Sequence, residues 1–485
     1  MSKTFEKKGL TKKSENISEW YHDVVLRAEL AEYSDVKGCM IIRPNGYALW
    51  ENAQTVLDNW FKKDGVQNVY FPIFVPMDLF EKEKKHVEGF SPELAVVTHA
   101  GGEELAAPLA IRPTSETVIT QKFADWIQSH RDLPMKLNQW CNVVRWEKRT
   151  YPFMRTSEFL WQEGHTAHAD KNDAMKMVLQ ALDWYKKFYE EFFAISPYVG
   201  LKSEGEKFAG ADATYSIELV MPDGKALQAA TSHYLGQNFG KAFNVQYLDD
   251  KGEKQYVHQT SWGFSTRSIG GLILTHGDDA GMVTPPKVAR LQTIILPVNS
   301  KDESVAEKLS SVSDELNNNL TAQGIRSAVD HDTKSSLGFR INEWELRGVP
   351  LRLEIGPKEL EAGQIQYVRR DNLQKGKISL ENAVPDIKRL LDQIQNDMLA
   401  KSERMKNDLT LDVEDFNQFK QALSDKKTFV RMLWCESAEC EQQIKLETKA
   451  TPRVLELDRV EENHDGKCPN CGKIANRKWL FAQSY

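Results

Sequence analysis

The stretch EFLWQEGHTAHA, residues 158–169, gathers two histidines, a carboxylate and a tryptophan. Its aromatic and threonine content favours a strand over a helix. Side chains alternate along a strand, so Trp161, Glu163 and His165 face one side and His168 faces the other. The two histidines are therefore not expected to share a zinc ion, and a hydrogen-bonded histidine beside a core tryptophan is the simpler interpretation of His165. A carboxylate among buried aromatic side chains needs a cationic or donor partner, which predicts a pocket for an ammonium or similar group.

Two arginines at the ends of predicted strands have the chemistry to bind a polyphosphate. Arg145 lies in NVVRWEKR (142–149), and Arg267 joins a strand to a Gly-rich helix in WGFSTRSIGGLILTH (262–276). Guanidinium groups with carboxylates nearby suit an ATP site that stabilises the charge of an in-line displacement, although a single arginine is more often a surface ion pair. The sequence GxxxxGK[ST] is absent, which excludes a P-loop ATPase.

The helix predicted within RPTSETVITQKFADWI (112–127) begins with the polar residues Thr114, Ser115 and Glu116. In the simpler interpretation, Glu116 is the carboxylate of a capping box. The position three residues before it is Pro113, so that interpretation requires a cap elsewhere.

Four of the six cysteines lie in the last 51 residues. They form two clips, WCESAEC with Cys435 and Cys440, and KCPNCGK with Cys468 and Cys471. Two such clips predict a tetrahedral, structural zinc site without an open position, with free thiols as the alternative. Cys39 and Cys141 stand in apolar surroundings and are expected in the core.

Length and periodicity predict three domains. At ~100 to 200 residues per domain, a chain of 485 residues is too long for one core. Apolar residues recur at helical spacing over 46–64, and period-two alternation over 140–168 and 214–266 favours an antiparallel sheet. Beyond a boundary near 284–296, a small α/β domain is expected, and a third unit follows the charged stretch KSERMKNDLT (401–410). In the α/β domain, strands are expected at 291–297, 325–330, 351–356 and 364–369, and helices at 301–323, 336–347 and 380–400.

Composition and charge narrow the class of protein. No apolar run approaches the ~18 residues of a membrane helix, and the lysine-rich N-terminus lacks the apolar segment of a secretion signal, so a cytoplasmic protein is expected. A net charge of −7 gives no bulk attraction to nucleic acid. RWEKR (145–149), YVRRD (367–371) and NRKW (476–479) remain candidate contacts, although each is more often a solvated surface.

These elements together resemble the class II aminoacyl-tRNA synthetases. CMIIRPNGYALWE (39–51) is similar to motif 1, the dimer-forming element, and the segments around Arg145 and Arg267 are similar to motifs 2 and 3. The combination of TSE, VVRWE, FLWQEGH, KFAGA (207–211) and QAATSHYLGQNF (228–239) resembles prolyl-tRNA synthetase of the archaeal and eukaryotic type. The resemblance covers nearly the whole chain. It implies a class II catalytic domain on an antiparallel sheet (1–285), an α/β anticodon-binding domain (286–402) and a small zinc-binding α/β domain (403–485).

The resemblance also implies roles for individual residues. Proline would be bound by Thr114, Glu116, Arg145, Trp161, Glu163, His165, Phe208 and His233. ATP and its magnesium would be held by Arg145, Glu147, Arg155, Thr156, Gln228, Thr231, Ser265 and Arg267. The two arginines Arg145 and Arg267 would be catalytic, and zinc would be bound by Cys435, Cys440, Cys468 and Cys471. The implied activity joins L-proline to tRNA(Pro) through prolyl-adenylate, releasing AMP and diphosphate, in a homodimer.

Two finer expectations and three alternatives accompany this resemblance. Only about 95 residues separate His165 from Trp262, so no editing insertion is expected there. The terminal carboxylate of Tyr485 is expected to fold back toward the active site, as in this family type. A threonine-type synthetase would need a set of metal ligands in the pocket, and a non-catalytic tRNA-binding regulator would usually lack the two arginines. A stand-alone zinc-dependent module would leave the first 280 residues unexplained.

Overall fold

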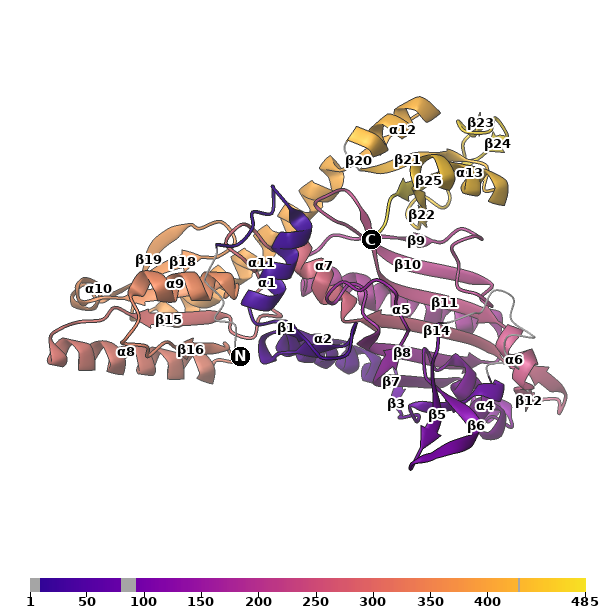
Figure 1. Ribbon diagram of the computed structural model, residues 1–485, viewed down its shortest axis with the longest axis horizontal. Coiled ribbons are helices and arrows are strands. Elements are labelled where there is room, and N and C mark those ends of the chain that lie inside the picture. Colours follow the sequence, from indigo (N-terminus) through magenta and orange to yellow (C-terminus); the bar gives the residue numbers. More distant parts are fainter. Residues whose placement is uncertain (1–8, 80–92, 426–427) are drawn as a thin grey trace.

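The computed structural model describes residues 9–79, 93–425 and 428–485, and a single large sheet organises most of it (Figure 1). This sheet runs, in spatial order, through β20 (Thr410–Asp412), β21 (Phe429–Trp434), β25 (Arg477–Ala482), β22 (Thr451–Glu456), β9 (Tyr198–Leu201), β10 (Ala213–Val220), β11 (Ala226–Gly236), β14 (His258–Ser265), β8 (Glu158–His168), β7 (Met135–Val144) and β3 (Gln67–Asn68). The antiparallel sheet predicted over 140–168 and 214–266 is therefore confirmed, from β10 to β7.

One face of this sheet is packed against helices. α5 (Lys171–Glu191) lies across β8, β10, β11 and β14, and α2 (Pro44–Lys63) and α7 (Arg267–His276) pack beside it. The alternation along β8 explains the division between its faces. Gln162 donates to Asn138 and accepts from Tyr185 of α5, and Gly164 meets the ring of buried Trp262, so this face of the strand is core. The opposite face, with Trp161 and Glu163, is left for a cavity.

Smaller elements surround the large sheet. α1 (Ile17–Arg27) precedes the hairpin of β1 (Ala31–Tyr33) and β2 (Met40–Ile42), and a three-stranded sheet consists of β4 (Phe74–Pro76), β6 (Glu103–Ile111) and β5 (Ala95–Ala100). α4 (Glu116–Trp126) begins directly at the TSE segment, and α6 (Asn238–Phe243) precedes the hairpin of β12 (Gln246–Leu248) and β13 (Lys254–Tyr256). Ser115 is the N-cap residue of α4 but makes no side-chain cap bond; its hydroxyl donates to Glu163, and the Glu116 carboxylate accepts from the Thr114 hydroxyl.

The α/β unit forms a separate five-stranded sheet, seen in orange in Figure 1. Its order is β16 (Ser327–Val329), β15 (Thr293–Pro297), β17 (Leu351–Ile355), β18 (Gln364–Arg369) and β19 (Lys375–Ser379), with α8 (Glu303–Ala322), α9 (Leu337–Leu346), α10 (Pro357–Glu361) and α11 (Ala383–Asp408). The predicted strands and helices are confirmed, while β19 and α10 were not predicted. The charged stretch 401–410 is not a linker, because most of it is the last two turns of α11.

The last unit continues the large sheet instead of standing apart from it. β22 pairs with β9, which belongs to the first part of the chain, with Leu455 opposite Leu201 and Glu456 opposite Gly200. α12 (Phe416–Asp425), α13 (Ala438–Thr448) and the short pair β23 (Gly466–Lys467) and β24 (Ile474–Ala475) complete the unit. The sequence predicted a separate zinc-bearing unit but not this shared sheet.

Arginines of two of the basic clusters form ion pairs with carboxylates of the same chain. Arg369 contacts Asp371 and Asp397, and Arg370 makes a bidentate pair with Asp278. Both arginine side chains are buried, so the YVRRD candidate for nucleic-acid contact is wrong. In NRKW, Arg477 pairs with Glu436. Within the described ranges, every helix is too short or too polar to cross a bilayer.

Candidate functional site

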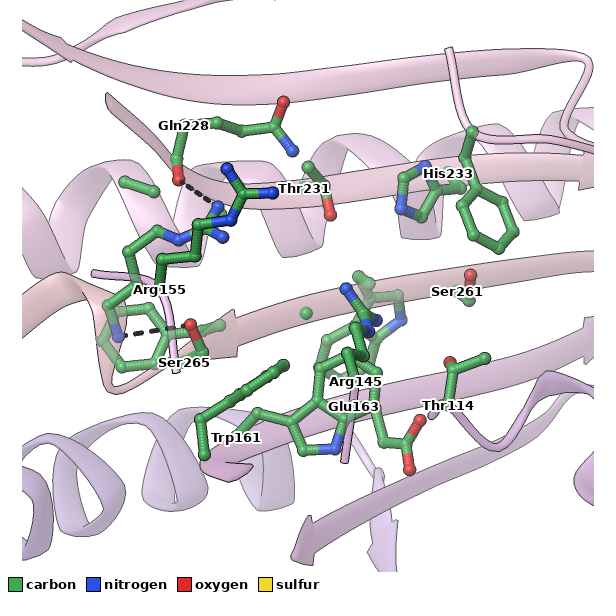
Figure 2. A pocket seen from close by; sticks show the side chains of 18 of the residues that line it. Thr114, Arg145, Arg155, Trp161, Glu163, Gln228, Thr231, His233, Ser261 and Ser265 are labelled. Carbon is green, nitrogen blue, oxygen red and sulfur yellow. Dashed lines mark hydrogen bonds between the residues drawn. The ribbon is translucent and has the colours of Figure 1, made fainter. Parts of the chain in front are cut away.

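A cavity of about 350 Å³ opens on the face of the sheet opposite α5. Fourteen of the fifteen side chains that the resemblance assigned to ligands line it, namely Thr114, Glu116, Arg145, Glu147, Arg155, Thr156, Trp161, Glu163, Phe208, Gln228, Thr231, His233, Ser265 and Arg267. The exception is His165, which is buried behind Glu163 and outside the lining. Figure 2 shows Thr114, Glu163 and His233 toward one end, and Gln228, Arg155 and Ser265 toward the other, with Arg145 between them.

The Glu163 carboxylate is held by several donors. Its Oε2 accepts from the Ser115 backbone N–H at 3.1 Å and lies 3.1 Å from His165 Nε2. Its Oε1 accepts from the Ser115 hydroxyl and from Gln139 Nε2 at 3.0 Å. Burial alone would raise the pKa of Glu163, but the hydrogen bonds and the charge of His165 bring it below the usual value. Glu163 is therefore an ionised carboxylate at the floor of the cavity.

A second carboxylate lies next to Glu163. Glu116 Oε2 accepts a hydrogen bond from the Thr114 hydroxyl, and both residues are buried in the cavity wall. Glu116, Glu163 and His165 bring one potential ligand atom each within 4.8 Å of one another. Alternation along the strand predicted that His165 and His168 face opposite sides, and the structure confirms this. Alternation could not predict the cluster with Glu116, because Glu116 lies on α4 and not on β8.

Aromatic rings form the wall opposite these carboxylates. The rings of Phe208 and His233 are 4.7 Å apart, and Thr214 Oγ1 lies 2.9 Å from His233 Nδ1. Burial and the positive charges of His165 and Arg145 lower the pKa of His233 to about 3, so its ring is neutral at ordinary pH. By contrast, burial lowers the pKa of His165, but the hydrogen bond to Glu163 and the charges of Glu116 and Glu163 together outweigh it and raise that pKa. This end of the cavity thus combines a flat apolar wall with anionic oxygens, which suits a compact cation.

Arginines dominate the other end. Arg145 extends over Trp161, with its guanidinium 5.4 Å from the ring centre, and donates to the Pro113 carbonyl. Arg267 donates to the Met154 carbonyl at 3.0 Å and to the Gln228 carbonyl at 3.4 Å. Burial lowers the pKa of both guanidiniums, and Arg145 further lowers that of Arg267. Two guanidinium cations that line the same cavity favour an anionic ligand such as a phosphate chain.

A neighbouring cavity of about 480 Å³ holds the end of the chain. It shares Arg155, Gln228 and Arg267 with the first cavity, and Tyr485 forms part of its wall. The Tyr485 backbone N–H donates to the Ala226 carbonyl at 3.1 Å, and Lys225 Nζ lies 4.6 Å from the centre of its ring. The last two residues therefore lie beside arginines of the first cavity, while a role of the terminal carboxylate itself stays a prediction.

The four C-terminal cysteines converge as their spacing predicted. Their sulfur atoms lie within 4.8 Å of one another, with Cys435 and Cys471 Sγ 3.4 Å apart and Cys440 and Cys468 Sγ 3.7 Å apart. Hydrogen bonding from the Cys440 thiol lowers the pKa of Cys468 to about 4. A closed group of four sulfurs with a thiolate already favoured fits a tetrahedral zinc ion.

Several residues around the cavity were missed or misjudged from the sequence. Cys39 and Cys141 are not core residues, since both are partly exposed. Cys141 Sγ accepts from Trp161 Nε1 at 3.2 Å and lies 3.6 Å from Glu163 Oε1, close to the cavity floor. Gln139 was not singled out. The feature that identifies Gln139 as a site residue is the pairing of β7 with β8, which places Gln139 opposite Glu163.

Comparison with known proteins agrees with this arrangement. Three family models match, the class II tRNA synthetase core domain (G, H, P, S and T) over residues 99–276, an anticodon binding domain over 292–390 and the prolyl-tRNA synthetase C-terminal domain over 416–485. The chain is 47% identical to proline–tRNA ligase 2 of Clostridioides difficile, over 98% of each chain, and 49% identical to proline–tRNA ligase of Pelodictyon phaeoclathratiforme, over 98% of this chain and 99% of that one. A crystal structure of prolyl-tRNA synthetase from Cryptosporidium parvum, complexed with halofuginone and AMPPNP, superposes with a TM-score of 0.94 at 44% identity, covering 98% of this chain and 99% of that one. A second one, complexed with L-proline and AMP, has a TM-score of 0.94 at 42% identity and covers 100% of this chain and 99% of that one.

Proposed function

The chain belongs to the class II prolyl-tRNA synthetases and is a proline–tRNA ligase, and from this premise we propose how its residues divide the work. The carboxylate end of the cavity receives proline, and the arginine end receives ATP. The observation that carries this assignment is the ionised, buried Glu163 beneath a wall of aromatic rings, with two arginines across the same cavity. Proline offers a cationic nitrogen, an apolar ring and a carboxylate, which match these surfaces in turn.

At the proline end, we assign the direct contacts with the secondary ammonium to Thr114 and Glu116. Each oxygen of Glu163 already has at least two partners in the chain, so Glu163 acts mainly through its charge. Trp161, Phe208 and His233 enclose the ring, and a neutral His233 avoids repelling the ammonium. His165 lies behind Glu163 and supports its ionised form.

At the ATP end, Arg145 lies between the two halves of the cavity, where it would contact both the proline carboxylate and the α-phosphate. Arg267 stabilises the developing charge, and the remaining assigned ATP contacts are Glu147, Arg155, Thr156, Gln228, Thr231 and Ser265. Mg²⁺ bound with ATP would neutralise further charge on the phosphates.

The chemistry follows from this placement. A proline carboxylate oxygen attacks the α-phosphorus, and diphosphate leaves. A hydroxyl of the 3′-terminal ribose of tRNA(Pro) then attacks the prolyl carbonyl, and AMP leaves. The first step needs no base, because a carboxylate is already the nucleophile, so catalysis there is positioning and charge stabilisation.

The remaining features complete the proposal. We place the domain boundaries near residues 285 and 402. We also assign the chain to the archaeal and eukaryotic type of the family, which its match to the C-terminal domain model and its four-cysteine cluster support. We further propose a structural zinc ion in that cluster, a homodimer formed through residues 39–51, the absence of an editing insertion and a cytoplasmic location.

A non-hydrolysable prolyl-adenylate analogue, the prolyl sulfamoyl adenosine, tests the assignment of the two ends. Calorimetry should show tight binding that is weakened by Glu116→Gln and by Arg145→Ala, since each change removes a contact at a different end. The threonyl and alanyl analogues should bind more weakly. Equal binding of all three analogues, or no effect of either substitution, would overturn the assignment.

A further inference from the structure

We propose that the C-terminal unit holds one wall of the amino-acid pocket in place, with Glu441 and Arg453 as positioning residues. The wall in question is residues 202–212, called the wall loop below, which contributes Glu206 and Phe208 to the cavity. This inference rests on the proposed function, because it takes the carboxylate end of the cavity as the proline site. Three independent contacts connect the C-terminal unit to this loop.

The first contact is made by the backbone. The wall loop begins directly after β9, and β9 pairs with β22 of the C-terminal unit through Leu455 opposite Leu201. On its other side β9 pairs with β10, with Leu201 opposite Tyr215. The residue that precedes the loop is therefore fixed between a strand of the catalytic part and a strand of the C-terminal unit.

The second contact is a buried charge network. Arg453, on β22, donates to Glu218 Oε2 through Nε at 3.0 Å and through Nη2 at 2.9 Å, and its Nη1 lies 4.0 Å from Glu206 Oε2. Lys202, the first residue of the wall loop, pairs with Glu218 Oε1 at 3.4 Å. Lys202, Glu218 and Arg453 are at least 95% buried. A buried charge without its partner is costly, so this network resists movement of the loop away from β22.

The third contact comes from α13. The Ser203 hydroxyl donates to Glu441 Oε1 at 3.3 Å, and both side chains are buried. The same carboxylate packs against the next turn of the loop, since a Cβ placed on Gly205 would lie 2.7 Å from Glu441 Oε1. Glu441 directly follows Cys440, so the helix that carries this contact also carries one member of the cysteine cluster.

The loop transmits these contacts to the aromatic wall. The Phe208 backbone N–H donates to Thr214 Oγ1 at 2.9 Å, and the same oxygen lies 2.9 Å from His233 Nδ1. The Lys202 backbone N–H donates to the Thr214 carbonyl at 2.8 Å. A shift of the loop would therefore separate Phe208 from His233, whose rings enclose the amino-acid end. Arg145 directly follows β7 and Arg267 begins α7, so both arginines would stay in place.

Glu441→Ala tests this inference in the full-length protein. It removes the acceptor of the Ser203 hydroxyl, and we expect the KM for proline in ATP–pyrophosphate exchange to rise about three- to ten-fold, as for the loss of one hydrogen bond, while the KM for ATP changes less than about twofold. Glu441→Gln keeps an acceptor oxygen at the same place and should restore the KM for proline. Glu447→Ala, an exposed glutamate on the same helix that pairs with Lys420, is the matched control and should leave both constants unchanged.

A measurement independent of activity accompanies the kinetics. Hydrogen–deuterium exchange of peptides from residues 202–212 should be about three- to ten-fold faster in Glu441→Ala than in Glu447→Ala. Ser203→Ala should reproduce the effect, and the double variant should add nothing to it. Unchanged loop exchange and an unchanged KM for proline would overturn the inference. Equal rises in the KM for proline and for ATP would also overturn it, whereas failure of the wild-type protein to exchange with proline would refute the proposed function instead.

Discussion

Replacing Gln139 by methionine should move the acid limb of proline activation to higher pH. Gln139 is fully buried and donates to Glu163 Oε1 at 3.0 Å, and methionine has nearly its shape but neither polar atom. A hydrogen bond to a charged group contributes about 1.5–3 kcal/mol. Its loss should therefore raise the pKa of Glu163 and, on the acid side of that pKa, lower kcat/KM for proline roughly ten- to a hundred-fold relative to the wild type.

The sign of the effect follows from the ionised form being the active one. The pKa of Glu163 is lowered in the folded protein, so kcat/KM for proline is complete above that pKa and is lost as pH falls through it. In Gln139→Met the loss should begin at higher pH. The pKa of the neighbouring His165 is raised and that of Glu163 is lowered, so His165 loses its proton at higher pH than Glu163, and the acid limb reports on Glu163.

The assay is ATP–pyrophosphate exchange at limiting proline, measured across the acid range. Gln162→Met is the matched control, because Gln162 is equally buried but donates to Asn138 on the core face of β8. It should reduce stability without moving the limb. An acid limb that coincides in Gln139→Met and the wild type, or that moves equally in both variants, would refute the argument.

Three further predictions concern packing, metal and the chain end. Gly164→Ala should lower the melting temperature of the catalytic part, at a cost of about 1–3 kcal/mol, because its Cβ would lie 2.2 Å from the Trp262 ring; an unchanged calorimetric transition would contradict this packing. Elemental analysis should find roughly one zinc per chain, and Cys468→Ser should lose it; full retention of zinc in the variant would contradict the four-sulfur site. Deletion of Ser484 and Tyr485 should slow proline activation roughly three- to ten-fold, since the contacts with Ala226 and Lys225 are lost; full activity would exclude a role for the chain end.

Local patterns predicted the elements that position the site. The alternation over 158–168 separated the cavity face of β8, with Trp161 and Glu163, from its core face, and this division is confirmed. The helical spacing over 46–64 likewise predicted α2. Such signals are carried by residues close in the sequence, so no knowledge of the fold is required to find them.

Contacts between distant segments could not be predicted in the same way. Gln139 is recognisable only from the β7–β8 register, and Cys141 looked like a core residue because its partner Trp161 lies 20 residues away. The YVRRD cluster looked basic because its carboxylate partners include Asp278, 92 residues before Arg370. The pairing of β22 with β9 joins segments more than 200 residues apart.

ATP–pyrophosphate exchange with purified protein, comparing proline with threonine, alanine and cysteine at matched concentrations, tests the central claim most directly. We predict exchange that favours proline over alanine by at least about tenfold, and its loss in Arg145→Ala. The absence of exchange with every amino acid, in a protein that is folded and binds tRNA, would contradict the assignment of this cavity to proline activation.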